Sequence, residues 1–232
     1  MKRQSEALER LVKARCGLLL REPFFGTLAL RLELQEDSKL KTIATNGRQL
    51  RFNPEWAMSL PLPELEAVVA HNVMHCALGH HLRRGSRDVE DWNDATDHAV
   101  NLELIQAGFQ LPEGSLASPE FKGMASEAIF DLISAREPED PNGRGKEEGR
   151  GAVSQQGATS QPGSGKPSES TGESATGKVE DAVDEEGDLV DEAEAEAQSN
   201  DWQQAVAQAA QAARGCGNLP GDIERALEVT LR

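Results

Sequence analysis

Aromatic residues are scarce in this sequence. Phe, Trp and Tyr make up 4% of the 232 residues, and the apolar residues together make up 38%. A chain of this length is long enough for one or two domains with a sizeable core, but so polar a composition cannot supply core side chains along its whole length. We therefore expect one long segment to lie outside the folded part.

Clusters of basic residues and long apolar runs are also missing. The formal net charge is -16 at pH 7, whereas surfaces that bind nucleic acids or anionic membranes need concentrated Lys and Arg. The first residues, MKRQSEALERL, contain no apolar signal-peptide region, and no apolar run reaches the ~20 residues of a membrane-spanning helix. These absences argue against nucleic-acid and membrane partners, and we expect a soluble cytoplasmic protein.

The few cysteines argue against a disulfide framework. Cys16, Cys76 and Cys216 are odd in number, far apart and in no CxxC pair, which is typical of reduced thiols. Cys76 directly follows His75, but on a helix it would lie about 140° around the axis from His71. We therefore expect Cys76 to be a buried thiol and not a metal ligand.

Residues 1–136 do show the pattern of one α+β domain. Leucines alternate with other residues over 28–34, as in a half-buried strand, and Asn46-Gly47 suits a tight hairpin turn. The elements predicted for the first half of this domain are a helix at 5–20 and strands at 28–34, 41–45 and 48–53. Together they predict a small antiparallel sheet that precedes a helical part.

Three further helices are predicted in this domain. Pro61 and Pro63 open the first, which carries most of the histidines. Asp91 and Ser126 can cap the other two, because their side-chain oxygens accept hydrogen bonds from free backbone N–H groups. The expected ranges are 61–84, 92–107 and 126–134. The sheet would then pack on a core formed by these helices.

The remaining residues differ in composition. Residues 137–198 are rich in Gly, Ser, Pro, Gln and Glu, and ten carboxylates with no basic residue lie between Val179 and Glu196. Such a segment cannot bury enough apolar area to offset its loss of conformational entropy, so we expect a disordered acidic linker. Residues 199–232 predict a pair of helices, which are too short to fold alone and would dock on the first domain.

The segment HNVMHCALGHH, residues 71–81, holds four of the five histidines. Positions i and i+4 of a helix lie about 40° apart on one face, so His71 and His75 can offer two imidazoles to one tetrahedral ion. On an unbroken helix His81 would point about 80° away from His71, and His80 would face the opposite side. The HxxxH spacing alone does not establish a metal site, because two structural histidines fit it equally well.

A third ligand is expected from the next helix. Asn93, Asp97 and Asn101 recur there at four-residue intervals and form a polar stripe on an otherwise apolar helix. A bound ion, with the groups around it, would give such a stripe an interior partner. Asp97 is therefore the first candidate for the third ligand, with Asp94 and His81 as the alternatives.

Longer stretches around these residues resemble a bacterial family of metallopeptidase domains. The resemblance is carried by NGRQLRFNPEW, LPELEAVVAHNVMHCALGHHLRRGSRDVEDWNDATDHAVN, GFQLPEG and the late GNLPGDIER. It implies a minimal gluzincin-like fold with an HExxH helix, and Zn²⁺ held by His71, His75 and Asp97. It also implies a protein or peptide substrate, a C-terminal von Willebrand factor A-like domain, and a neighbouring MoxR-like AAA+ ATPase as partner.

The chain departs from the family pattern at position 72, where HExxH has glutamate and this sequence has Asn72. The glutamate is the general base, and an amide cannot accept a proton in its place. Losing such a base commonly costs ~10²–10⁴ in rate. We therefore expect a zinc peptidase scaffold with little or no hydrolysis, either a native pseudo-peptidase or an inactivated variant. The alternative is a non-catalytic peptide-binding adaptor that works with an AAA+ ATPase or an A-like domain.

Overall fold

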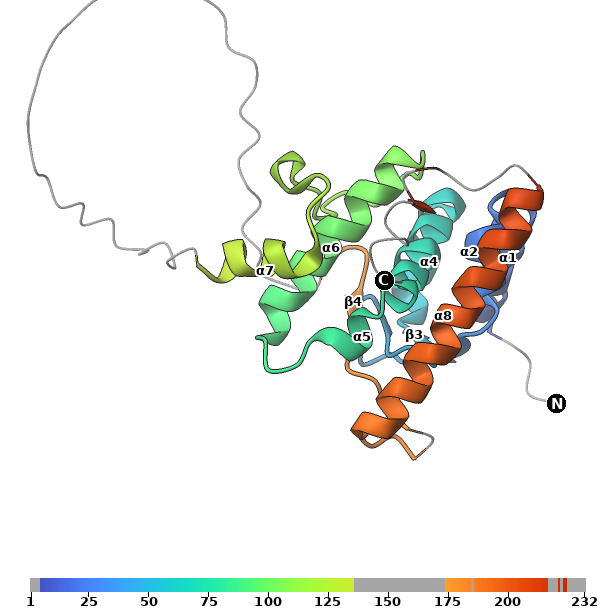
Figure 1. Ribbon diagram of the computed structural model, residues 1–232. Helices are drawn as coiled ribbons and strands as arrows, with labels where there is room; N and C mark the ends of the chain where they lie inside the picture. Colours follow the sequence, from blue (N-terminus) through green and yellow to red (C-terminus); the bar gives the residue numbers. More distant parts are fainter. Residues whose placement is uncertain (1–4, 136–173, 185, 217–220, 222, 225–232) are drawn as a thin grey trace, which may run out of the picture.

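The computed structural model describes residues 5–135, 174–184, 186–216, 221, 223 and 224 (Figure 1). These residues form a mixed α+β arrangement of eight α-helices and one four-stranded sheet, which confirms the expected α+β class. The helices are α1 (Glu6–Arg21), α2 (Pro23–Ala29), α3 (Pro54–Ser59), α4 (Leu62–Ala77), α5 (His80–Arg83), α6 (Val89–Gln106), α7 (Ser126–Ser134) and α8 (Glu192–Gly215). The strands are β1 (Glu33–Glu36), β2 (Ile43–Thr45), β3 (Gln49–Phe52) and β4 (Lys178–Val179).

The sheet is mixed, with strand order β1-β3-β2-β4. β2 and β3 form an antiparallel hairpin, whereas the β1–β3 and β2–β4 pairs are parallel. The expected antiparallel sheet is therefore wrong for these two pairings. The reason is that β1 pairs with the second strand of the hairpin, and that β4 comes from a distant segment, which the composition assigned to the linker.

The predicted strand at 28–34 is also wrong over its first part, where α2 ends, and β1 is shorter and begins later. Pro23 at the first helical position starts α2. Phe24, Phe25 and Leu28 then follow at helical spacing, and all three are buried. The burial of these side chains on one helix face outweighs the local alternation of leucines.

The hairpin turn at Asn46-Gly47 is confirmed. Gly47 has φ +88°, in the left-handed region that favours glycine. Asn46 Oδ1 accepts hydrogen bonds from the backbone N–H groups of Arg48 (3.0 Å) and Gln49 (2.9 Å). A Cβ atom at position 47 would overlap the ring of His81. The turn therefore packs directly against α5, which carries that histidine.

Replacing Gly47 with alanine should lower the free energy of unfolding by ~2–5 kcal/mol. A left-handed backbone costs a non-glycine residue about 1–2 kcal/mol, and overpacking against the buried His81 ring adds about 1–3 kcal/mol. Gly108→Ala is the matched control, because Gly108 has φ +90° with open space around it. Urea unfolding measures both variants, and equal losses would show that the contact with His81 contributes nothing.

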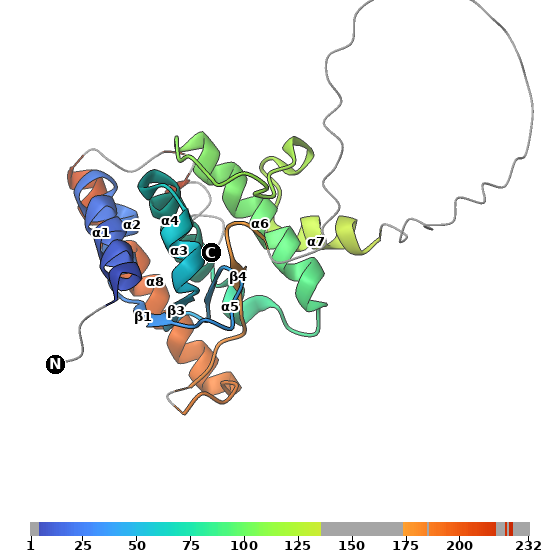
Figure 2. The same cartoon turned by 180° about the vertical axis from the view of Figure 1, so that it is seen from behind.

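α4 is the central helix. It lies between α6 on one side and α1 and α2 on the other (Figure 1 and Figure 2), and every residue from Leu65 to Ala77 is buried. The predicted continuation of this helix to about Arg84 is wrong. Gly79 takes φ +68°, and α5 begins only after this break. A left-handed glycine ends a helix because it cannot continue the right-handed turn.

The expected linker of residues 137–198 is described only in its last part, because residues 136–173 lie outside the described residues. In that last part the expectation of disorder is wrong, since β4 and the start of α8 fall inside it. Asp191 caps α8 by accepting a hydrogen bond from the N–H of Glu194 (2.9 Å). The carboxylates of the first turn suit the positive end of the helix dipole.

α8 packs on α2 and α4 (Figure 1). Trp202 on α8 donates its ring N–H to the carbonyl oxygen of Gly47 (3.0 Å), which ties this helix to the hairpin turn. Two helices are expected over 199–232. The first of them is α8, which begins earlier than predicted, at Glu192. The second lies largely outside the described residues. None of the helices that the structure describes is long and apolar enough to cross a bilayer.

Candidate metal centre

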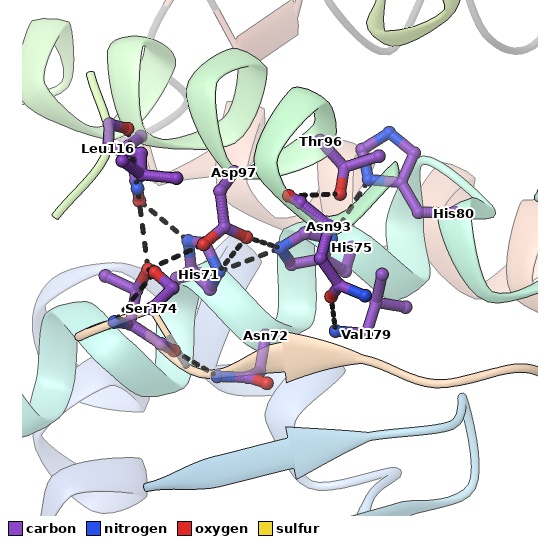
Figure 3. A network of polar contacts seen from close by, with 12 residues as sticks. His71, Asn72, His75, His80, Asn93, Thr96, Asp97, Leu116, Ser174 and Val179 are labelled. Carbon is purple, nitrogen blue, oxygen red and sulfur yellow. Dashed lines mark hydrogen bonds and ion pairs between the residues drawn. The ribbon is translucent and has the colours of Figure 1, made fainter. Parts of the chain in front are cut away.

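Two helices bring three potential ligands together. α4 carries His71 and His75 one turn apart, and α6 carries Asp97 opposite them (Figure 3). All three side chains are fully buried, and one ligand atom from each lies within 4.8 Å of the others. Among the described residues this is the only such group of three or more His, Cys, Asp or Glu side chains. These three residues can therefore hold one metal ion.

The distances between the ligand atoms have the size that coordination requires. His71 Nε2 lies 2.8 Å from His75 Nε2. Asp97 Oδ1 lies 3.3 Å from the first nitrogen and 3.2 Å from the second. Ligands at ~2.0–2.1 Å from a tetrahedral ion stand about 3.3 Å apart, so only the nitrogen–nitrogen side of the triangle is compressed. The alternative ligands, Asp94 and His81, are not part of this group.

Asn101 fixes the tautomer of His71. The side-chain N–H of Asn101 donates to the backbone carbonyl of Leu116 (2.9 Å), so its Oδ1 is the atom that faces His71 Nδ1 at 2.7 Å. An amide oxygen only accepts hydrogen bonds, and His71 therefore carries its proton on Nδ1. The Nε2 lone pair of His71 then points toward Asp97 and His75, as ligation requires.

His80 supports the second imidazole. His80 Nδ1 lies 3.1 Å from His75 Nδ1, and His80 Nε2 lies 3.1 Å from Ser126 Oγ on α7. If His75 Nε2 binds a cation, His75 must carry its proton on Nδ1 and donate it to His80. The prediction that His80 faces the opposite side is wrong, because the break at Gly79 gives α5 a new direction.

The centre contains a buried carboxylate with one oxygen that receives no hydrogen bond. Burial and the neighbouring His71 lower the pKa of His75 to about 4, so its ring is neutral at pH 7. Burial alone would raise the pKa of Asp97, but the two histidine rings outweigh burial and the net shift is downward. No group in the described part of the chain donates a hydrogen bond to Asp97 Oδ1. Because a buried polar atom that receives no hydrogen bond is costly, a cation between the three atoms fits this site.

Asn72 lies beside the centre but is not one of the ligands. Its Nδ2 donates to the carbonyl oxygens of Val68 (2.9 Å) and Thr176 (3.2 Å). Its amide oxygen cannot accept a proton. Glu66, which lies more than one turn earlier, forms an ion pair with Arg21. Neither side chain therefore provides a general base at the centre.

Cys76 is a buried thiol, as expected. Burial raises the pKa of this thiol to about 12, and its Sγ lies 3.4 Å from Thr45 Oγ1. A thiol that stays protonated is a poor metal ligand, and Cys76 is absent from the group that can hold a metal. The residue therefore belongs to the core beneath the sheet.

Sequence reasoning missed Thr176. This residue is fully buried, and its Oγ1 donates to Asp97 Oδ2 (3.3 Å) and accepts from the side-chain amide of Asn101 (3.4 Å). The surrounding sequence is polar and acidic, so its composition gave no sign of a buried contact. The one local signal is Val179, a strand-favouring residue that follows Thr176 closely and is also buried.

Comparison with known proteins gives a family and one distant relative. The family model described as "Putative metallopeptidase domain" matches residues 6–232. An uncharacterized protein of Thermotoga maritima is 30% identical over 112 residues, and this match covers 45% of the present chain and 28% of that protein. The similarity is thus limited to a minor part of the relative. No solved structure matches the chain.

Proposed function

The chain belongs to the family described as "Putative metallopeptidase domain", and from this premise we propose that it is a zinc peptidase scaffold with little or no hydrolytic activity. The convergence of His71, His75 and Asp97 on one point is the observation that carries the proposal. Two imidazoles, one carboxylate and a free fourth position are a ligand set of catalytic zinc sites. In this scaffold Asn72 stands where the general base would be.

Each residue at the centre then has its own chemical role. His71 and His75 offer Nε2 lone pairs, and Asp97 supplies negative charge. A bound Zn²⁺ would supply Lewis-acid activation of water and of a peptide carbonyl. Asn72 can donate an N–H but cannot accept a proton, so it cannot carry the proton from water to the leaving amine. Hydrolysis therefore fails at proton transfer, whereas binding of the cation does not depend on position 72.

The second candidate is a peptide-binding adaptor. Asn72 donates to the carbonyl oxygen of Thr176, a peptide group, while β4 pairs with the edge of β2. An extended peptide of another protein would be held by the same kind of contacts. The family resemblance suggests a MoxR-like AAA+ ATPase or a von Willebrand factor A-like domain as the partner. A complex with such a partner that survives a chelator would support this candidate.

Metal content is the most direct test of the zinc scaffold. The full chain, purified without chelators, should contain about one zinc ion per molecule by elemental analysis. His75→Ala should lose most of it, because the substitution removes one of the three converging ligand atoms. A chain that takes up no stoichiometric divalent cation, even when Zn²⁺ is supplied in excess, would overturn the zinc scaffold and leave His71 and His75 as structural residues.

Replacing His80 with phenylalanine should weaken zinc binding by ~10–100-fold, the usual effect of losing a group that orients a ligand. Phenylalanine keeps the ring in the buried space but cannot accept the proton of His75 Nδ1. Ser126→Ala is the control, because it leaves His80 in place, and it should change the affinity much less. Competition with a chromogenic chelator measures both constants. An unchanged affinity in folded His80→Phe would remove His80 from the centre.

A further inference from the structure

The metal centre is covered. His71, His75 and Asp97 have no exposed surface, so neither a peptide nor a chelator can reach them in this structure. Part of the cover is residues 174–182, which we call the strap. Thr176 of the strap is fully buried and donates a hydrogen bond to Asp97 Oδ2 (3.3 Å). The strap therefore touches the centre directly.

The strap lies along the sheet as an added edge strand. β4 pairs in parallel with β2, with Thr45 opposite Val179, and the N–H of Glu180 donates to the carbonyl of Thr45 (2.8 Å). On the other side, Asn93 of α6 accepts a hydrogen bond from the N–H of Val179 (2.8 Å). The backbone of the strap is thus held from both sides, as an extended peptide is held when it adds to a sheet edge.

Asn72 adds a third point of attachment. Its side-chain amide donates to Val68 O within α4 and to Thr176 O in the strap, so its donor nitrogen is shared between two carbonyl oxygens. A glutamate at this position would turn carboxylate oxygens toward the same carbonyl oxygens, and these atoms repel one another. Asn72, the residue that departs from the HExxH pattern, therefore favours a closed strap, whereas glutamate would oppose it.

We propose that the strap is a built-in strand that occupies the peptide groove over the metal centre, and that Asn72 keeps it closed. The inference rests on the proposed function, because the groove receives a peptide only if the centre belongs to a peptidase scaffold. None of the three ligands lies on the strap. Opening the strap would therefore expose the centre and leave the ligand set intact.

Gly177 is the position at which the strap can be displaced. It has φ +106°, and a Cβ atom there would overlap Ile43 on β2. Gly177→Ala should therefore push the strap away from the sheet edge without altering a ligand. Arg84 Nε donates to Asp181 Oδ1 (2.8 Å), so the far end of the strap stays attached. Gly187→Ala is the matched control, because Gly187 has φ +94° with open space around it.

Zinc release is the first measurement. The full chain is loaded with Zn²⁺ and mixed with excess chelator, and the rate of transfer is followed. Gly177→Ala should release zinc about tenfold faster than the unmodified chain, the factor expected for the loss of one hydrogen bond. Asn72→Leu has a similar shape without the donor and should behave in the same way, whereas Gly187→Ala should not. If both test variants fold and still release zinc at the rate of the unmodified chain, the proposal that the strap closes the centre is refuted.

Trypsin cleavage after Lys178 is the second measurement, and it does not require a metal. Lys178 lies in β4, so its peptide bond is protected while the strap is closed. Cleavage there should be about tenfold faster in Gly177→Ala and Asn72→Leu than in Gly187→Ala. If the chain binds no zinc and the test variants are still cleaved faster, the zinc scaffold is refuted, and the result shows only that Asn72 and Gly177 hold the strap closed. If the chain binds zinc but the test variants and Gly187→Ala have equal cleavage and release rates, the proposal of a closing strap is refuted and the zinc scaffold is not.

Discussion

Replacing Asn72 with glutamate should raise peptide hydrolysis by ~10²–10⁴-fold, the contribution of a general base. Position 72 lies on α4 next to His71, where a carboxylate would face the region beside the ligands. Glutamate can take a proton from water and pass it to the leaving amine, which asparagine cannot do. The zinc affinity should change little, because position 72 is not among the three ligands.

Asn72→Gln is the matched control for this gain. Glutamine has the length of glutamate but no group that accepts a proton. Initial rates on a pool of fluorogenic peptides, with both variants loaded with Zn²⁺, separate the effect of the base from the effect of side-chain length. Equal rates for Asn72→Glu and Asn72→Gln would argue against a peptidase scaffold and favour the peptide-binding adaptor.

The same substitution should also loosen the strap, since the new carboxylate would face the carbonyl oxygen of Thr176. Part of the gain in Asn72→Glu would then come from access to the centre and not from proton transfer. Asn72→Leu measures the contribution of access alone, because it removes the hydrogen bond to the strap without adding a base. The difference between the two variants is the contribution of the base alone.

The three candidate ligands could be proposed from the sequence because helix geometry is local. The spacing of His71 and His75 places both on one face whatever surrounds the helix. Asp97 was favoured by the polar stripe it shares with Asn93 and Asn101, and all three residues of that stripe have a partner inside the molecule. A periodic pattern on one helix face predicts such an arrangement because the two helices must bury their apolar sides together.

His80 and Thr176 could not be placed in this way. The position of His80 depends on the helix break at Gly79, and the isolated pattern of histidines reads equally well as one continuous helix. Thr176 reaches Asp97 only because β4 adds to a sheet edge formed far earlier in the sequence. Composition reports the average polarity of a segment, and it does not detect a few buried residues inside a polar one.

The sheet, too, could be predicted only where its contacts are local in sequence. The hairpin of β2 and β3 was predictable because Asn46-Gly47 fixes the turn within a few residues. The parallel partners β1 and β4 were not predictable, because their pairing depends on contacts between distant segments. Strand pairing is set by side-chain packing over the whole sheet, and no local pattern contains that information.

Asp97→Asn should weaken zinc binding by more than about a hundredfold, which exceeds the ~10–100-fold effect of a group outside the ligand set. Asp97 supplies the only negative charge among the three ligands, and asparagine replaces it with a neutral amide of the same size. The metal-free variant should still fold and unfold cooperatively in urea, because asparagine has the same size and its amide oxygen can still accept the hydrogen bond of Thr176. Retained stability with lost affinity identifies a ligand and not a structural residue.

Asp94→Asn is the matched control, with the same change of charge on the same helix but outside the group of three. Its zinc affinity should stay within about twofold of the unmodified chain, because a partly exposed charge outside the group acts weakly on the buried site. Competition titrations of both variants against one chelator make the comparison direct. If Asp94→Asn loses the affinity and Asp97→Asn keeps it, the third ligand has been assigned to the wrong turn of α6. The strap would then contact a residue that does not bind the metal, and Thr176 would have no connection to the centre.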